Sequence, residues 1–373
     1  MFFRIKKILF AFLLALLAMA LSYVSTNLEV TISGERDVLK CWNFILNRLS
    51  GKPQNLVPDD VVFINVAADK RLVETFDGNA AITDRSKLTE LLNLIQAAGN
   101  YSYVMLDVFF EEGYESEADS MLFSTICSMK NIVIPRHKDG TLISSWLEEK
   151  AAYSDYSTNL KEDNFAKYPL LHRGDNMPSM PLKIYSDLTG RSVKRHGLIF
   201  TDNKALSRRV IFPKMYVRDA GFFNMGSELL DFRETIDWKE LLDNKIVIIG
   251  AFHDDDIHET YAGLIPGCVV NYNVLASLMR GQHRIPFGLT AVYFIIFFMM
   301  SLLLLSGGSD KKQQSLAWLW AKLFALYSVI LIVVCVLVFT VWGQAQDIFI
   351  TSTLFSIVDT GNRWISNRKK KNA

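Results

Sequence analysis

The sequence predicts an α/β domain that lies outside a membrane and is held there by an α-helical transmembrane bundle. Two observations carry this prediction. Uncharged apolar runs lie near both ends of the 373-residue chain and have the length of membrane-spanning helices. Between them, short runs of β-branched and apolar residues alternate with amphipathic stretches. This alternation indicates β-α-β crossovers and a largely parallel sheet flanked by helices.

The N-terminal apolar run extends from Ile8 to Val24 and follows a group of basic residues. A basic cytoplasmic flank orients such a helix with its C-terminal end outside. A cleaved signal peptide is the alternative, because Ala18-Met19-Ala20 has the form of a small-residue cleavage site. Both interpretations place residues 27–284 outside the cytoplasm. We expect an uncleaved anchor over residues 1–26.

Two to three further membrane helices are predicted after the domain. The first two are long and apolar, and the loop between them contains Lys311 and Lys312, so we expect this loop in the cytoplasm. The last is short and polar at its end, which is typical either of a marginal crossing or of an amphipathic surface helix. The basic tail that follows favours the crossing. The segments are 287–305, 316–342 and 348–366, and the tail is 367–373.

Continuous β-branched and apolar runs within the domain predict buried strands. The runs are Val61–Val66, Tyr103–Phe110, Asn131–Pro135 and Ile246–Gly250, and Val210–Val217 is expected as a strand at the edge of the sheet.

Helices are predicted between these strands. The clearest begins at Asp84, a suitable N-cap, and ends at Gly99, with leucine and isoleucine at helical spacing between them. A capping box at Ser116–Asp119 opens a second helix, so we expect a structural role for Asp119. Further helices are expected at Asn224–Asp231 and Gly267–Gly281, and residues 136–195 are expected to be an irregular excursion rather than a second domain.

Polar residues follow several of the predicted strands. In an open parallel sheet, ligands bind beyond the carboxyl ends of the strands, so these side chains are candidate neighbours. Carboxylates and imidazoles could hold a divalent cation or a cationic ligand. The alternative is a solvated acidic loop in which Asp107 accepts backbone hydrogen bonds. The ligand-binding candidates are Asp69, Asp107, Asp254, Asp256 and His258, and we expect Asp107 and the 254–258 loop to line one cleft.

Composition and motifs narrow the function classes. A formal net charge of +1 gives no general attraction to nucleic acid. None of the four cysteines forms a C-x-x-C pair, so buried free thiols are expected. His258-Glu259 begins like a zinc-protease motif but lacks the second histidine, and no nucleotide-binding loop or nucleophile elbow is present. We therefore expect no enzyme activity, no metal and no cofactor. The pair Arg208-Arg209 could bind an anionic ligand. Adjacent strand residues point to opposite faces, so we expect one of the two side chains to face solvent.

The order of these segments resembles the second type of CHASE domain, the sensory extracellular domains associated with bacterial cyclases and histidine kinases. The resemblance is strongest from Lys245 to Pro286, with Lys245-Ile-Val-Ile-Ile-Gly250, Asp256-Ile-His258 and Pro266-Gly267. It implies a domain that senses an external signal and passes it through transmembrane helices to a cytoplasmic enzyme. The chain departs from the family in two respects, because only a short basic tail follows Ser366, and because Asn271-Tyr272 replaces a common His-Ala pair.

The expected function is therefore a sensory or interaction module in the bacterial inner membrane, with its globular domain in the periplasm. It would relay a signal through its transmembrane helices to a separate membrane or cytoplasmic signalling protein, or to a second copy of itself. The surrounding lipid bilayer is its other contact. The alternatives are a structural or assembly component of an envelope complex and a membrane-tethered hydrolase.

Overall fold

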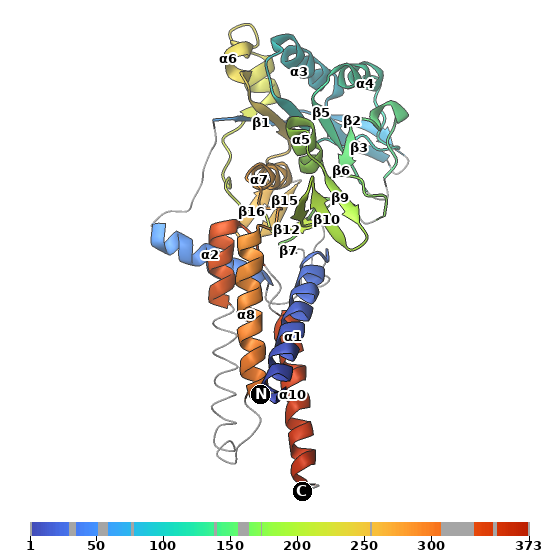
Figure 1. The fold of residues 1–373 in the computed structure, drawn as a ribbon. Coiled ribbons are helices and arrows are strands. Elements are labelled where there is room, and N and C mark those ends of the chain that lie inside the picture. Colours follow the sequence, from blue (N-terminus) through green and yellow to red (C-terminus); the bar gives the residue numbers. More distant parts are fainter. Residues whose placement is uncertain are drawn as a thin grey trace.

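An α/β domain and a group of long helices make up the computed structural model of the chain (Figure 1). The helices extend from one side of the domain, and both chain termini lie at their far end. The structure describes residues 2–29, 35–50, 59–75, 78–137, 140–155, 164–172, 174–253, 256–306, 332–345 and 349–371.

The centre of the domain is a six-stranded sheet with the order β13-β1-β14-β4-β5-β6. All neighbouring strands in it are parallel, so the predicted parallel α/β fold is confirmed. The predicted strand Tyr103–Phe110 is shorter than expected, because β4 ends at Leu106 instead of Phe110. The strands are β1 (Val61–Asn65), β4 (Tyr103–Leu106), β5 (Ile132–Arg136), β6 (Ala151–Tyr153), β13 (Phe223–Asn224) and β14 (Ile246–Gly250).

Helices cover both faces of the sheet, which explains why its central strands are apolar on both sides. One layer contains α3 (Arg85–Ala98) and α4 (Asp119–Ser128), and it packs on the face that includes Ile64. The other contains α5 (Met180–Thr189) and α7 (Gly267–Met279), and it packs on the face that includes Phe63. The sheet therefore lies between two separate hydrophobic clusters.

The predicted helix caps are present. Asp84 accepts the backbone N–H groups of Ser86 and Lys87 at 2.9 and 3.1 Å, and Gly99 ends α3 with a φ of 75°. The second helix begins at Asp119 rather than at Ser116, but the Asp119 carboxylate still accepts the Ser116 amide at 2.7 Å, as a capping box requires.

Two regions differ from the sequence-based expectations. The described residues between 136 and 195 form more regular structure than predicted, because they supply edge strand β6 and helix α5. The predicted edge strand Val210–Val217 is wrong: β12 covers only Val210–Ile211 and pairs with β8 outside the main sheet. The predicted Asn224–Asp231 helix is present as a π-helix, η2 (Met225–Leu230).

The remaining elements are β2 (Lys70–Thr75), β3 (Gly78–Thr83), η1 (Ser145–Leu147), β7 (Asn164–Phe165), β8 (Tyr168–Pro169), β9 (Val193–His196), β10 (Ile199–Asp202), β11 (Ala205–Ser207), α6 (Trp238–Leu242), β15 (Ile257–Thr260) and β16 (Gly263–Pro266).

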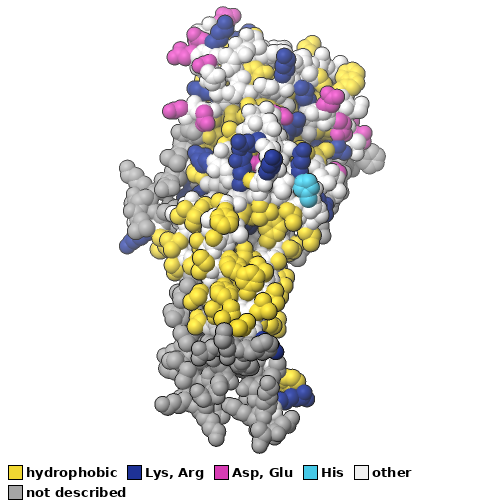
Figure 2. Space-filling model, in the orientation of Figure 1, with side chains coloured by type: hydrophobic (Ala, Val, Ile, Leu, Met, Phe, Trp, Pro, Cys, Tyr) yellow, Lys and Arg dark blue, Asp and Glu magenta, His cyan; other side chains and the backbone are white. Residues whose placement is uncertain are grey.

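Below the domain, α1 (Phe2–Thr26) and α8 (Phe287–Ser306) are long and apolar enough to cross a membrane. A helical segment at Ile332–Trp342 and α10 (Phe349–Lys371) complete the described part of the bundle. The first half of the predicted 316–342 segment and the loop with Lys311 and Lys312 lie outside the described residues. Figure 2 shows apolar side chains over most of the described bundle surface.

One helix, α2 (Glu35–Ser50), was not predicted. It lies beside the bundle where the bundle meets the domain (Figure 1). Its Trp42 ring packs edge-on against Phe339 at a centroid distance of 4.7 Å, and the Trp42 Nε1–H donates to the Thr340 hydroxyl at 2.9 Å. The cysteines are free as expected, but Cys41 on this helix is exposed, and only Cys268 and Cys335 are buried.

Candidate functional site

Asp107 follows the last residue of β4 and lies at the carboxyl edge of the sheet. Its backbone N–H donates to the Ile249 carbonyl at 2.7 Å, which continues the β4–β14 pairing by one residue. Its side chain accepts a hydrogen bond from Asn271 Nδ2 at 3.0 Å. Burial, together with the negative charge of Asp256, raises the Asp107 pKa to about 7, although the Asn271 bond opposes this shift. Asp107 is therefore a carboxyl group that exchanges its proton near neutral pH.

Asp256 and His258 lie on the segment that follows β14. The His258 Nε2 atom is 2.6 Å from Asp256 Oδ1. The Asp256 carboxylate reaches over Gly267 at the start of α7, where an added Cβ would lie 2.2 Å from Oδ2. Only glycine leaves room for this approach. Asp256 and His258 are both close enough to influence the Asp107 pKa, while the cleft that Asp107 and the 254–258 loop were expected to line stays a prediction.

Glycine also permits the close approach of the strand ends. A Cβ on Gly250, the last residue of β14, would lie 2.9 Å from the Cys268 Cβ and 3.3 Å from the Asp107 Cβ. The buried Cys268 thiol therefore packs directly beside the carboxylates. Its pKa is raised by burial and by the charges of Asp107 and Asp256, so it remains a neutral thiol.

Asn271 connects the site to the core. Its side-chain oxygen accepts the hydroxyl of buried Tyr168 at 2.7 Å, while its Nδ2 donates to Asp107. From the sequence, Asn271 was only a departure from the family pattern and was not among the predicted site residues. A signal was available, because a polar residue in the middle of an apolar helix requires a buried partner.

His137, which was also missed, belongs to a second polar group at the end of β5. The His137 ring stacks on Phe109 at 4.0 Å, its Nδ1 contacts the Asp155 carboxylate, and its Nε2 lies 3.9 Å from Glu111 Oε1. The pKa of His137 is raised first by Asp155 and then by Glu111 and Asp107. We call Asp107, His137, Asp256, His258 and Asn271 the carboxyl-edge site.

One predicted candidate, Asp69, has its partners elsewhere in the domain. Asp69 is buried, lies 2.5 Å from Lys87 Nζ, and accepts the Gly226 amide at 2.9 Å, so it stabilises the start of η2. Its role in ligand binding stays a prediction. Asp254 lies outside the described residues. No group of three or more histidine, cysteine, aspartate or glutamate side chains that could hold a metal ion is present among the residues that the structure describes.

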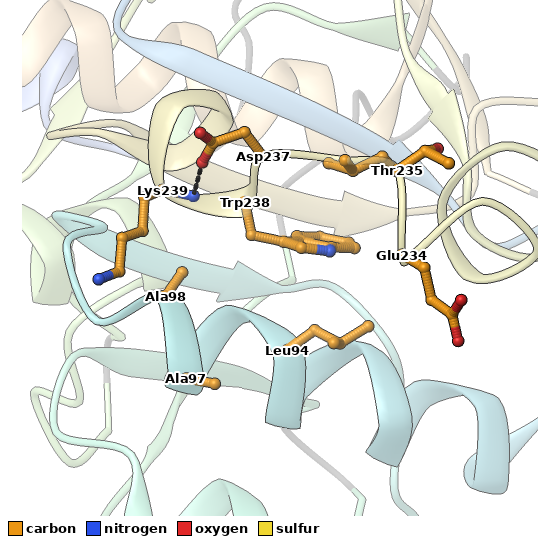
Figure 3. Close-up of a pocket in the computed structure, with 9 residues that line it drawn as sticks. Leu94, Ala97, Ala98, Glu234, Thr235, Asp237, Trp238 and Lys239 are labelled. Atoms are coloured by element: carbon orange, nitrogen blue, oxygen red, sulfur yellow. Dashed lines mark hydrogen bonds between the residues drawn. The ribbon is translucent and has the colours of Figure 1, made fainter.

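A groove of about 530 Å³ lies on a different part of the domain, between the C-terminal end of α3 and the segment that leads into α6 (Figure 3). Trp238 and Leu94 line it, and Asp237 caps α6 by accepting the Lys239 amide at 3.1 Å. It is open to solvent and adjoins the amino ends of the strands, where an open parallel sheet does not bind ligands. We therefore assign the site to the carboxyl edge and not to this groove.

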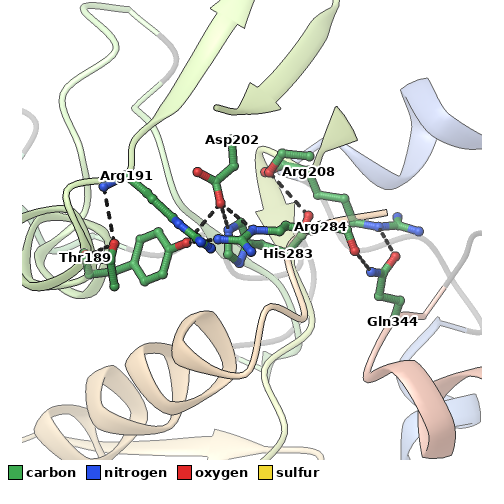
Figure 4. A network of polar contacts seen from close by, with 9 residues as sticks. Thr189, Arg191, Asp202, Arg208, His283, Arg284 and Gln344 are labelled. Carbon is green, nitrogen blue, oxygen red and sulfur yellow. Dashed lines mark hydrogen bonds and ion pairs between the residues drawn. The ribbon is translucent and has the colours of Figure 1, made fainter. Parts of the chain in front are cut away.

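The connection between the domain and the bundle forms a second polar network (Figure 4). We call residues 281–286, between α7 and α8, the linker. Buried Asp202 accepts hydrogen bonds from linker residues His283 Nε2 at 2.9 Å and Arg284 Nε at 2.5 Å, and from Tyr185 Oη at 2.9 Å. Burial alone would raise the Asp202 pKa, but these three bonds together lower it. Burial lowers the pKa of His283 in spite of the Asp202 bond.

The expectation for Arg208-Arg209 is wrong, because both arginines are buried in this connection. Arg208 Nε donates to Gln344 Oε1 at 3.1 Å, and Gln344 follows the Ile332–Trp342 helix. Arg209 forms an ion pair with Glu29, just beyond α1. Gln344 lies 136 residues after Arg208, and Glu29 lies 180 residues before Arg209, so sequence spacing gave no sign of these contacts.

Comparison with known proteins identifies a family for most of the chain. The CHASE2 domain family matches residues 12–308, which include the whole parallel sheet, α7, the linker and α8. No curated protein and no solved structure matches the chain. CHASE2 domains are sensory, extracellular-type domains rather than catalytic ones. The match covers well over half of the chain, and the chain therefore belongs to the CHASE2 domain family.

Proposed function

We propose that this protein is a membrane-anchored sensor whose domain lies on the periplasmic side of the bacterial inner membrane. In this proposal, a ligand binds at the carboxyl-edge site, and α7 and the linker transmit the change to α8. A separate membrane or cytoplasmic signalling protein, or a second copy of the chain, then responds. The observation that carries the proposal is the continuous connection from Asp107 through α7 to α8.

Helix α7 contacts the site at its N-terminal half. Gly267 lies under the Asp256 carboxylate, and Asn271, one turn later, holds Asp107. Nearly every side chain of the helix is buried. Because a packed helix cannot move independently of its neighbours, a displacement caused at Asn271 has to reach the C-terminal end of the helix at Met279.

The linker continues this connection into the bundle. Arg284 and His283 are bound to Asp202, and the Ile285 amide donates to the Leu206 carbonyl at 2.8 Å. Pro286 follows directly and precedes α8. A linker held this firmly to the domain would act as a rigid joint rather than a flexible tether, so α8 would follow the domain.

Several features support the membrane anchor. Helices α1 and α8 have the length and composition of spans, and both chain termini lie at the same end of the bundle, as expected if both are cytoplasmic (Figure 1). Helix α2 has the amphipathic character of an interfacial helix, with Trp42 turned toward the bundle and Phe44 exposed.

Hydrogen exchange on the full chain in lipid nanodiscs tests the relay. Asn271→Ala removes the bridge between α7 and Asp107, so we expect faster exchange at the linker amides from Gln282 to Ile285. Asn79→Ala, an exposed asparagine on β3, is the matched control. The amides of α3 serve as an internal reference for general destabilisation. Linker exchange that is unchanged, or that rises only in step with α3, would contradict the relay.

Cross-linking in native membranes, followed by gentle-detergent purification, tests the partner. A signalling protein or a second copy should be captured with the chain. A reproducible complex with envelope assembly proteins alone would favour the structural alternative. Recovery of a bare monomer would remove the main support for signalling.

A further inference from the structure

The small sheet β9–β11 has an unusual outer face. Its register places Lys194 opposite Thr201, and Thr201 opposite Leu206, so these side chains share one face with Ile199. The other face is turned inward, and its Val193, Phe200, Asp202 and Ser207 are buried. The outer face combines basic and apolar side chains in a pattern that an ordinary solvated sheet does not need.

The exposed charged side chains of this sheet and its flanking residues are all basic. Between residues 191 and 206 the exposed charged side chains are Arg191, Lys194, Arg195 and Lys204, and the one acid in the stretch, Asp202, is buried. Leu198 at the turn between β9 and β10 is 71% exposed, and Ile199 beside it is 51% exposed. Exposed apolar side chains beside clustered cations are typical of surfaces that contact anionic lipid.

Helix α1 holds the sheet at a defined position along the candidate membrane span. The Phe200 amide donates to the Tyr23 hydroxyl at 3.0 Å, and this hydroxyl donates to the Ser207 carbonyl at 3.0 Å. Tyr23 lies within the last turn of the candidate span Ile5–Thr26. The turn with Leu198 is therefore held at the level where this helix would leave the bilayer. Figure 2 shows Lys and Arg side chains on the domain immediately next to the apolar surface of the bundle.

We propose that the β9–β11 sheet binds the anionic phospholipid headgroups of the leaflet that faces the domain. Lys194 and Arg195 contact the phosphates, and Leu198 and Ile199 enter the interface between headgroups and acyl chains. The proposal rests on the proposed membrane anchoring, which sets the depth of the sheet. It adds a lipid-sensitive contact directly beside Asp202, the residue that holds the linker.

Hydrogen exchange on the full chain tests this proposal, with nanodiscs of phosphatidylcholine alone and nanodiscs in which a third of the lipid is phosphatidylglycerol. We expect slower exchange at amides 197–199 in the anionic discs. Each cation near an anionic surface strengthens binding about five-fold, so Lys194→Gln with Arg195→Gln should reduce the preference for anionic discs by at most about thirty-fold. Leu198→Ser, at a side chain too exposed to affect folding, should weaken the protection in both discs.

The control is Lys130→Gln with Lys239→Gln, which removes two exposed lysines from other parts of the domain. It should leave the preference for anionic discs intact. Equal exchange of the sheet in the two kinds of disc, for a chain that has inserted into both, would overturn the lipid contact. A chain that fails to insert into either disc would instead overturn the proposed membrane anchor, so the two failures can be told apart.

Discussion

Replacing Asp107 by asparagine should stabilise the domain at neutral and alkaline pH. The reason is that the pKa of Asp107 is about 7 in the folded chain and 3.8 when unperturbed, so the folded state binds the proton more tightly than the unfolded state. For an acid with a raised pKa, stability falls as the pH rises from about 4 to about 7. About three pKa units, at about 1.4 kcal/mol each, set an upper limit of about 4 kcal/mol.

The expected gain is smaller than this limit. Part of the Asp107 shift comes from the charge of neighbouring Asp256, and the Asn271 bond already favours the charged form of Asp107. Asparagine has nearly the same shape and can still accept this bond through Oδ1. We therefore expect a gain of roughly 2 kcal/mol at pH 8, or a rise in the melting temperature of about 4–8 °C for a domain of this size.

Thermal unfolding of the full chain in one detergent, at pH 5 and pH 8, measures this effect. The gain at pH 5 should be less than half of the gain at pH 8. At pH 5 the pH is only about one unit above the unperturbed pKa of 3.8, whereas the full shift to about 7 extends over about three units. Glu234→Gln, at an exposed glutamate, is the control and should show no such difference. Destabilisation by Asp107→Asn at both pH values would contradict this prediction. It would mean that Asp107 is a structural acceptor whose charged hydrogen bonds contribute about 1.5–3 kcal/mol.

Three further predictions concern packing, the linker and topology. Gly250→Ala should destabilise the domain by about 1–3 kcal/mol in a thermal melt, because its Cβ would collide with Cys268, and an unchanged melting temperature would contradict this contact. Asp202→Asn should cost about 1.5–3 kcal/mol and speed exchange at the linker, and exchange that stays slow would show that the linker is held by other contacts. Reporter fusions after Asp231, Lys312 and Ala373 should read outside, inside and inside, and an outside reading at Ala373 would exclude a crossing by α10.

The parallel sheet could be predicted because its central strands are apolar on both faces and alternate with capped helices. The same reasoning predicted that Asp107 would meet Asp256 and His258, since neighbouring parallel strands end at one edge. The strand order along the chain did not show that Asp69 lies apart from Asp107, Asp256 and His258. Asp69 follows β1, which β14 separates from β4, and its partner Lys87 on α3 becomes apparent only in three dimensions.

Other parts of the site depend on contacts between distant segments. Asn271 and Tyr168 are 103 residues apart, and no local pattern joins them. The connection of Arg208 with Gln344 spans 136 residues and links two elements that were assigned to different regions. Helix α2 is a different case. Leu39 and Trp42 already have helical spacing in the sequence, but the helix is amphipathic rather than apolar, so a search for membrane spans passes over it.

Because α7 is buried on all sides, few displacements of this helix are possible, and this limits the signal that the protein could transmit. The predicted apolar stripe accounts for one face of the helix, but Asn271 and Asn273 are buried as well and bind Asp107 and the Val217 backbone. Buried hydrogen bonds of this kind allow discrete positions of a helix rather than continuous sliding, because an intermediate position would leave them unpaired. A ligand at Asp107 can shift α8 only as far as its affinity differs between two such positions. A ten-fold difference in affinity supplies about 1.4 kcal/mol, which is comparable to one of these hydrogen bonds and is enough to change which position is populated.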